Sequence, residues 1–322
     1  MPKILIVRLS SMGDVIHNFP AITDLANAYP NADIHWAVEE GFADLPRLHP
    51  AVTKVIPFAL RRWRKNMLSR KTWSEISAFR HTLASEQYDL IIDSQGLVKS
   101  AIVSSFGHAP TAGYDRRSIR EPLASLLYDR RFAVSRDLHA VIRNRLITAA
   151  PLGYTPDERV NYGITAPDLP QMWRGAQPYV VCLTATSRDD KLWANENWIE
   201  LGTQLAAQGL RIILPWGSPR EAQRAQEIAA QITDAVVAPK LTLPEGARLL
   251  QDARAVVGVD TGLVHLAAAV GTPVVALYCA SNPGLTGVLA GGFYENLGEY
   301  GAPPRCVDVM AATQRALEAR TC

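Results

Sequence analysis

One junction near the N-terminus constrains the fold more than any other feature of this 322-residue chain. An apolar run over residues 4–7 gives way to the segment SSMGD at 10–14, after which apolar residues return at helical spacing. A strand that leads directly into a helix begins a βαβ unit, and ligands bind at the carboxyl ends of the strands in open α/β sheets. Asp14 lies at such an end and is the first functional candidate. A helix cap and a general base both suit this position, so both interpretations stay open.

Apolar runs and helical periodicity alternate along the rest of the chain in two series. Strands are predicted at residues 4–7, 35–38, 55–58 and 90–93, and again at 179–183, 211–215, 236–239, 255–259 and 274–278. Helices are predicted at residues 20–28, 73–83, 198–208, 219–231 and 263–269. Between the two series, residues 154–178 are rich in Pro and Gly and lack periodicity, which is typical of a linker. The pattern predicts an α/β protein of two similar domains.

Size and composition agree with two domains of an ordinary globular protein. The chain exceeds the usual size of one hydrophobic core, and no segment approaches the roughly 20 consecutive apolar residues that cross a bilayer. No secretory signal is recognisable at the N-terminus, which predicts a cytoplasmic protein. The four cysteines, Cys182, Cys279, Cys306 and Cys322, form no C-x-x-C pair, so neither a zinc site nor a disulfide framework is indicated.

The loop at residues 184–193 follows a predicted strand and offers the donors that a diphosphate needs. It combines hydroxyls and backbone amides with Lys191, although a solvated loop would hold the same mixture. Asp189 and Asp190 suggest a metal ion, but the adjacent Arg188 and Lys191 are expected to compete for both carboxylates. We therefore predict no metal and interpret Lys191 as a cation that neutralises phosphate.

A second loop of this half follows the strand predicted at 255–259 and begins with Asp260, Thr261 and Gly262. Asp260 or Thr261 is expected to cap the next helix, whose free amides would then face an anion, although a cap alone explains these residues equally well. His265 lies one turn inside that helix and carries little weight alone. Neither a G-x-G-x-x-G nor a P-loop signature is present, which disfavours a dinucleotide dehydrogenase and a P-loop enzyme.

The first half of the chain carries a dense basic cluster. Residues 61–71 contain six Lys or Arg and no acid, and Arg116, Arg117 and Arg120 form a second patch. The first 160 residues hold 21 Lys and Arg against 16 Asp and Glu, a net charge of +5, whereas the remainder carries −3. A nucleic acid, an anionic membrane and a polyanionic substrate are the candidate partners. Nucleic acid is disfavoured because the whole chain is only +2 and no nucleic-acid motif accompanies the patch.

Six ordered segments together resemble the ADP-heptose glycosyltransferase family, glycosyltransferase family 9. They are SSMGD at 10–14, RRWRK at 61–65, DSQGLVKS at 93–100, REPLAS at 120–125, RDDK at 188–191 and DTG at 260–262. The resemblance extends from residue 3 to about residue 285. It implies a GT-B fold, in which two Rossmann-like α/β/α domains face a central cleft. Residues 1–160 would bind the acceptor and residues 161–322 the ADP-heptose, while a last helix at 310–320 could pack back on the N-terminal domain.

The resemblance also implies a reaction, that of the members adding the first heptose of the lipopolysaccharide inner core. L-glycero-D-manno-heptose would pass with inversion from ADP-L-glycero-β-D-manno-heptose to the inner Kdo of Kdo2-lipid A, with Asp14 as the base and no metal or other cofactor. Because lipid A is anchored in the inner membrane, the basic surface would hold the enzyme peripherally at the cytoplasmic face. A related enzyme that adds a later heptose and a non-catalytic module that binds nucleotides or anions remain the alternatives.

Residues are assigned to each substrate by the same resemblance. The donor residues implied are Thr186, Ser187, Lys191, Glu221, Asp260, Thr261, Gly262 and His265. The acceptor residues implied are Ser11, Arg61, Arg62, Arg64, Lys65, Arg120 and His139. The family commonly has two threonines where this chain has Thr186 and Ser187, and since the hydroxyl is kept, we expect the contact to be kept.

Overall fold

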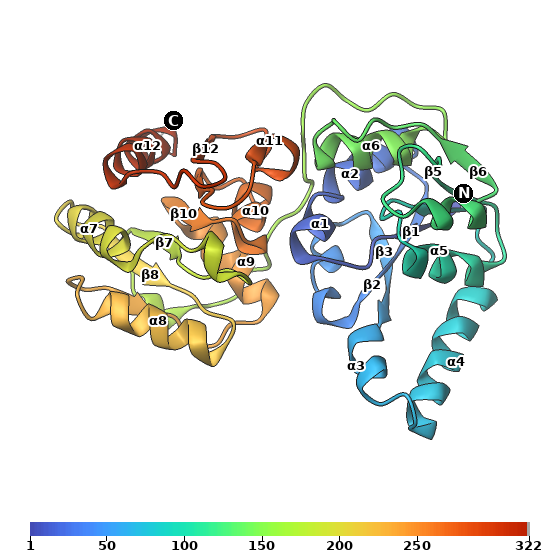
Figure 1. The fold of residues 1–322 in the computed structure, drawn as a ribbon, viewed down its shortest axis with the longest axis horizontal. Helices are drawn as coiled ribbons and strands as arrows, with labels where there is room; N and C mark the ends of the chain where they lie inside the picture. Colours follow the sequence, from blue (N-terminus) through green and yellow to red (C-terminus); the bar gives the residue numbers. More distant parts are fainter. Residues whose placement is uncertain (321–322) are drawn as a thin grey trace. The chain divides into compact units, whose positions relative to one another are not determined.

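The computed structural model describes residues 1–320 and divides the chain into two compact units, Met1–Gly163 (unit 1) and Ile164–Cys322 (unit 2). Each unit contains one six-stranded sheet whose neighbouring strands all run parallel (Figure 1). The division falls after Gly163 rather than after residue 160. Cys322 lies outside the described residues, and the other three cysteines are buried free thiols.

Unit 1 has the strand order β3-β2-β1-β4-β5-β6. Its strands are β1 (Lys3–Val7), β2 (Asp33–Glu39), β3 (Val52–Phe58), β4 (Leu90–Asp93), β5 (Thr111–Tyr114) and β6 (Arg130–Phe132). Its helices are α1 (Met12–Ile16), α2 (Phe19–Ala28), α3 (Leu60–Lys65), α4 (Arg70–Ser85), α5 (Val98–Ser104) and α6 (Ala140–Ala149), with a 3-10 helix η4 (Pro122–Leu127) between β5 and β6. The strand order reverses between β1 and β4, so the loops after these two strands diverge and form the topological switch point where ligands bind in such sheets.

The basic helix α3 is held to unit 1 by its tryptophan. Trp63 is buried and packs against Phe58 of β3 and Phe79 of α4, with ring centroids 5.3 and 5.9 Å away. The Trp63 indole also donates a hydrogen bond to Glu75 Oε2 at 2.8 Å. Figure 1 shows α3 and α4 extending away from the sheet of unit 1. Trp63 thus anchors α3 together with the partly buried Leu60, and the four basic side chains of the helix are exposed.

Unit 2 repeats the same order as β12-β11-β10-β7-β8-β9. Its strands are β7 (Tyr179–Leu183), β8 (Arg211–Leu214), β9 (Val236–Val237), β10 (Ala255–Val259), β11 (Val274–Leu277) and β12 (Tyr294–Leu297). Its helices are α7 (Asn195–Ala206), α8 (Pro219–Ala229), α9 (Leu243–Asp252), α10 (Gly262–Ala269), α11 (Pro283–Thr286) and α12 (Cys306–Ala319), with a 3-10 helix η6 (Asp189–Lys191). Here the order reverses between β7 and β10, which places the second switch point at residues 184–191 and 260–262.

The last helix, α12, packs against α7, β10, β11 and β12. Its buried residues Val309, Ala312 and Ala316 join the core of unit 2. The helix therefore packs on the sheet of unit 2. Among residues 1–320, no helix has the length and the apolar character of a membrane-spanning segment.

Candidate active site

The end of β4 forms the floor of the site in unit 1. Asp93 is fully buried, and its Oδ1 accepts the backbone N–H groups of Gln95 at 2.8 Å and Gly96 at 3.1 Å, while Oδ2 accepts the Tyr128 hydroxyl at 2.6 Å. Burial raises the pKa of Asp93, although these donors act in the opposite direction. Gly96 has a φ of 71°, a left-handed conformation that favours glycine. The turn holds Gln95 directly beside the loop that follows β1.

Two side chains from the segment after β4 form hydrogen bonds with the loop between β1 and α1. Gln95 accepts the Leu9 backbone N–H at 2.8 Å and donates to the Ser10 carbonyl at 3.2 Å. Lys99 Nζ donates to Ser10 Oγ at 2.9 Å. Burial lowers the pKa of Lys99, partly offset by Glu39 and other nearby carboxylates. The sequence analysis assigned no site role to Gln95 or Lys99, although both lie in the segment DSQGLVKS.

Asp14 is the third residue of α1 and completes a capping box with the N-cap residue Ser11. Its Oδ2 accepts the Ser11 backbone N–H at 3.0 Å and the Ser11 hydroxyl at 2.8 Å, and its Oδ1 pairs with Arg8 Nη2 at 3.0 Å. The side chain is nevertheless 35% exposed, so a substrate hydroxyl can approach it. The capping interpretation is confirmed, and the same exposed carboxylate remains available as a base.

The charges around Asp14 decide its protonation state. Burial acts to raise its pKa, but Arg8, the two hydrogen bonds from Ser11 and the charge of Arg120 outweigh burial, and the pKa lies below its usual 3.8. The carboxylate is therefore ionised at neutral pH. Arg8 is a site residue that the sequence analysis missed, and it also donates to the Ser94 carbonyl.

Three of the four basic residues on α3 are available for an anion. Arg61, Arg64 and Lys65 are exposed and form no ion pair with the residues that the structure describes. Arg62 differs, because it pairs with Glu40 at 3.0 Å and with Glu75 at 2.5 Å. These carboxylates lie outside the acid-free segment 61–71, so nothing within that segment indicated that the charge of Arg62 is already compensated.

The remaining acceptor candidates lie on other elements of unit 1. Arg120 is exposed just before η4 and contributes to the field at Asp14. His139 is the N-cap of α6, where its Nδ1 accepts the Val141 N–H at 3.3 Å, and its ring lies 5.8 Å from that of His17 at the end of α1. Ser11, Asp14 and Arg120 are thus joined by contact or charge.

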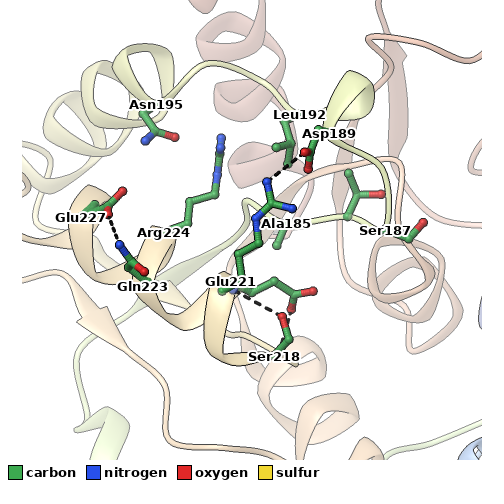
Figure 2. A pocket seen from close by; sticks show the side chains of 12 residues that line it. Ala185, Ser187, Asp189, Leu192, Asn195, Ser218, Glu221, Gln223, Arg224 and Glu227 are labelled. Carbon is green, nitrogen blue, oxygen red and sulfur yellow. Dashed lines mark hydrogen bonds and ion pairs between the residues drawn. The ribbon is translucent and has the colours of Figure 1, made fainter.

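Unit 2 contains a pocket of about 430 Å³ at the carboxyl ends of β7 and β8. Thr186, Ser187 and Glu221 line it, together with Arg220 and Arg224 of α8. In Figure 2, Glu221 lies beside Ser218 at the start of α8 and Arg224 comes from the same helix. A pocket of this volume is suited to a nucleoside. Glu221 was predicted from the sequence, but the two arginines were not. Arg220 and Arg224 contact residues of the loop after β7 only once α8 has formed and packed beside that loop.

Two of the pocket's side chains retain hydrogen-bonding capacity. Glu221 Oε2 accepts the N–H groups of Gly217 at 2.7 Å and Ser218 at 3.3 Å, which leaves Oε1 without a bond within the described residues. Arg224 Nη2 donates to the Trp193 carbonyl at 2.6 Å, whereas its buried Nε has no partner in this part of the chain. A carboxylate oxygen and a guanidinium N–H are groups that can bind hydroxyl and ring acceptor atoms of a nucleoside.

Asp260 is the centre of a polar cluster beside this pocket. Its Oδ2 pairs with Lys191 Nζ at 2.5 Å and accepts the Ser281 hydroxyl at 2.7 Å, while its backbone carbonyl accepts the Thr186 hydroxyl at 2.8 Å. Lys191 was expected to compete for Asp189 and Asp190, and that prediction is wrong. Asp190 pairs with Arg188 as expected, but Asp189 pairs with Arg220 at 2.9 Å.

The N-terminus of α10 lies directly after Asp260. Thr261 is its N-cap, but no side-chain capping bond forms there within the described residues, so the first amides of the helix remain available to an anion. The expectation that Asp260 or Thr261 caps the helix is therefore confirmed for Thr261, which caps it without a side-chain hydrogen bond among the described residues. Buried His265 lies behind the cluster, with Nε2 4.0 Å from Asp260 Oδ1, and does not line the pocket. Gly262 is the first residue of α10.

No group of three or more His, Cys, Asp or Glu side chains that could hold a metal ion occurs among residues 1–320. The two aspartates that suggested a metal are held by arginines instead.

Each unit thus places polar side chains at the switch point of its own Rossmann-like sheet, an arrangement typical of the GT-B fold. The profile of the family described as Glycosyltransferase family 9 (heptosyltransferase) matches residues 76–306. The chain belongs to this family and is a glycosyltransferase.

Individual relatives agree with that assignment. Lipopolysaccharide heptosyltransferase 1 of Escherichia coli K12 is 47% identical over 287 residues, which covers 88% of this chain and 90% of the relative. The structure of E. coli heptosyltransferase WaaC with ADP superposes with a TM-score of 0.90 at 42% identity and covers 98% of this chain and 99% of that one. The structure of WaaC with ADP-2-deoxy-2-fluoro heptose gives a TM-score of 0.86 at 41% identity, with the same coverage.

Proposed function

We propose that this enzyme transfers L-glycero-D-manno-heptose from its ADP donor to the inner Kdo of Kdo2-lipid A, the first heptose transfer of the lipopolysaccharide inner core. The observation that carries the proposal is Asp14, an ionised and partly exposed carboxylate at the switch point of unit 1, surrounded by cations. Relatives that are 46–47% identical to this chain are heptosyltransferases 1, and the related WaaC structures contain ADP and an ADP-heptose analogue, which supports this choice of donor and reaction.

The donor is proposed to bind to unit 2. The nucleoside would enter the pocket, where Glu221 Oε1 accepts the ribose hydroxyls and Thr186 and Ser187 contact the diphosphate. Lys191 would exchange its partner Asp260 for the diphosphate, joined by the amides of Thr261 and Gly262 at the start of α10. Asp260, released from Lys191, would then accept a heptose hydroxyl, and buried His265 would position Asp260.

The proposed reaction is a single displacement with inversion at the heptose anomeric carbon. The Kdo hydroxyl oxygen forms a bond to that carbon while the bond to the β-phosphate oxygen breaks, and ADP leaves with the electron pair. Asp14 accepts the hydroxyl proton. Because its pKa is low, Asp14 takes the proton effectively only as the attacking oxygen becomes acidic late in bond formation. Lys191 and the α10 amides stabilise the negative charge that grows on the leaving diphosphate.

The acceptor is proposed to bind to unit 1 through its anionic groups. Kdo carboxylates and lipid A phosphates match the unpaired cations Arg61, Arg64, Lys65 and Arg120, with Ser11 and His139 as hydrogen-bonding partners. Arg62 would act by holding α3 through Glu40 and Glu75 rather than as a free cation. The same basic surface would attract the enzyme to the anionic cytoplasmic face of the inner membrane as a peripheral protein.

The test is to incubate purified protein with ADP-heptose and de-acylated Kdo2-lipid A, and to follow ADP release and the mass of the acceptor. We expect a gain of one heptose that requires both substrates. ADP binding without any gain would support the non-catalytic module. A gain only on an acceptor that already carries one heptose would support the later transferase instead.

A further inference from the structure

The 3-10 helix η4 of unit 1 shows an inverted pattern of burial. Its small residues Ala124 and Ser125 are buried, whereas Leu123, Leu126 and Leu127 are 70%, 63% and 45% exposed. Residues three apart eclipse each other in a 3-10 helix, so Leu123 and Leu126 project together as one ridge. Leucines normally face the core, and an apolar ridge turned to solvent marks an interaction site.

The neighbouring helix adds to this apolar surface. Helix α5 packs against η4 and presents Ile102, which is 44% exposed between the buried Ala101 and Val103. We define the leucine ridge as Leu123, Leu126 and Leu127. The three leucines are not part of the hydrophobic core of unit 1, where η4 contributes Ala124 instead.

Arginines flank the leucine ridge on both sides along the sequence. Five of them lie in the segments that enter and leave η4, all exposed and without an ion pair among the described residues: Arg116, Arg117, Arg120, Arg130 and Arg131. Three carboxylates lie in the same segments, and all accept backbone N–H groups: Asp115 from Ser118 at 2.8 Å, Glu121 from Val98 at 2.7 Å and Asp129 from Thr111 at 2.8 Å. Five arginines against three carboxylates give residues 115–131 a net charge of +2.

We propose that the leucine ridge inserts into the interface of an anionic bilayer and seats unit 1 on the membrane, with the arginines on the lipid phosphates. Apolar side chains bordered by Lys or Arg are what interfacial binding requires, since its strength follows the apolar area buried plus attraction to anionic lipid. Arg120 lies two residues before the start of η4, so insertion would bring the acceptor-binding surface to headgroup level. The inference rests on the proposed function for its membrane-embedded acceptor, and it adds a specific apolar contact to the basic surface.

The test compares two double variants on vesicles of equal parts phosphatidylglycerol and phosphatidylethanolamine. Leu123→Gln/Leu126→Gln alters the ridge, and Leu285→Gln/Val307→Gln alters two exposed aliphatic residues of unit 2 as the matched control. We expect the ridge variant to lose at least about tenfold in vesicle partitioning, since apolar transfer of two leucines is removed, and the control to bind as the unaltered enzyme does. Unchanged partitioning of the ridge variant would overturn the proposal.

Two further measurements separate this inference from its competitors. Turnover of the soluble de-acylated acceptor should be equal in the unaltered enzyme, the ridge variant and the control variant. If none of the three proteins turned over this acceptor, the proposed function would be overturned, but the proposed membrane contact of the ridge would not. A change in sedimentation from dimer to monomer in the ridge variant, with vesicle binding unchanged, would identify a contact between copies and overturn the proposal.

A labelling experiment keeps the proposal testable if the double variant does not fold. Leu126→Cys, made in a Cys322→Ser background, leaves three buried native thiols and one exposed thiol for an environment-sensitive fluorophore. A blue shift on these vesicles, absent on phosphatidylcholine vesicles, is expected from insertion. Emission that does not change on the anionic vesicles would contradict it.

Discussion

Replacing Asp14 by Asn separates its two roles, because an amide oxygen can still accept the Ser11 hydrogen bonds but cannot take a proton from the acceptor. General-base assistance is worth roughly 10² to 10⁴ in rate, or about 2.7–5.5 kcal/mol at 1.36 kcal/mol per tenfold. We therefore expect kcat of Asp14→Asn to fall by about 10² to 10⁴ while ADP affinity, which depends on unit 2, stays the same. The assay measures ADP release with saturating acceptor, and calorimetry measures ADP binding.

The same substitution has a separate structural cost that can be checked independently. Arg8 is largely buried and loses its carboxylate partner at 3.0 Å, and a hydrogen bond to a charged group contributes about 1.5–3 kcal/mol. Thermal unfolding of the variant should shift by a corresponding amount. Ser11→Ala is the matched control, since it removes the hydroxyl that Asp14 accepts but keeps the carboxylate. The reasoning is refuted if Asp14→Asn keeps more than about a tenth of kcat, a loss well below the range for a general base, or if Ser11→Ala is equally damaging.

The pH dependence gives a further check on Asp14. Its pKa lies below 3.8 in the folded chain, so the ionised carboxylate stabilises unit 1 above that pH, and this contribution is lost as the pH falls through the folded-state pKa. The acid limb of kcat/KM should accordingly lie below pH 3.8. Arg8→Met removes the strongest opposing charge and should move that limb to higher pH. A limb that stays in place would show that Arg8 does not set the pKa.

Three further substitutions test other parts of the account. Lys191→Met should lower kcat/KM for ADP-heptose by about 10- to 100-fold through both kcat and KM, because a charged hydrogen bond that binds the diphosphate and stabilises its growing charge is lost; unchanged donor kinetics would remove Lys191 from the site. Arg64→Glu should raise the acceptor KM up to about tenfold and weaken its salt dependence, whereas the exposed Lys240→Glu in unit 2 should not, and equal effects of the two would contradict the acceptor surface. Arg145→Met should destabilise unit 1 by about 3–5 kcal/mol in denaturant unfolding, because it leaves buried Asp24 without its bidentate partner at 2.6 and 2.9 Å, and a loss below about 1 kcal/mol would refute this.

The strands that could be predicted from the sequence are those with a continuous apolar run, because such a run is itself a signal of a buried strand. All nine predicted strands are present, since runs such as Val180 to Leu183 in β7 are apolar throughout. Strands β5, β6 and β12 were missed because they lack such an apolar run. Strand β5 contains Gly113, β6 contains two arginines, and β12 contains the polar Glu295 and Asn296. These strands are therefore recognisable only from their pairing with a neighbouring strand in the folded sheet. Helix α9 was missed although Thr242 and Glu245 form a capping box at its start.

The site residues that could be predicted are those that come directly after a buried strand. Asp14 and Asp260 each come directly after a buried strand, so their positions at the switch points followed from the alternating pattern. Their partners did not, because pairs such as Arg62 with Glu40 and Lys191 with Asp260 join residues from different elements. Tertiary contacts of this kind leave no local signal in one sequence.

The configuration of the new heptosidic bond tests the central claim most directly. Product made from ADP-L-glycero-β-D-manno-heptose and de-acylated Kdo2-lipid A can be examined by NMR at the anomeric carbon. The account predicts inversion to the α-heptoside, because one deprotonated hydroxyl displaces ADP in a single step with Asp14 as base. Retention of the β configuration, or release of ADP with no heptose added to the acceptor, would contradict it.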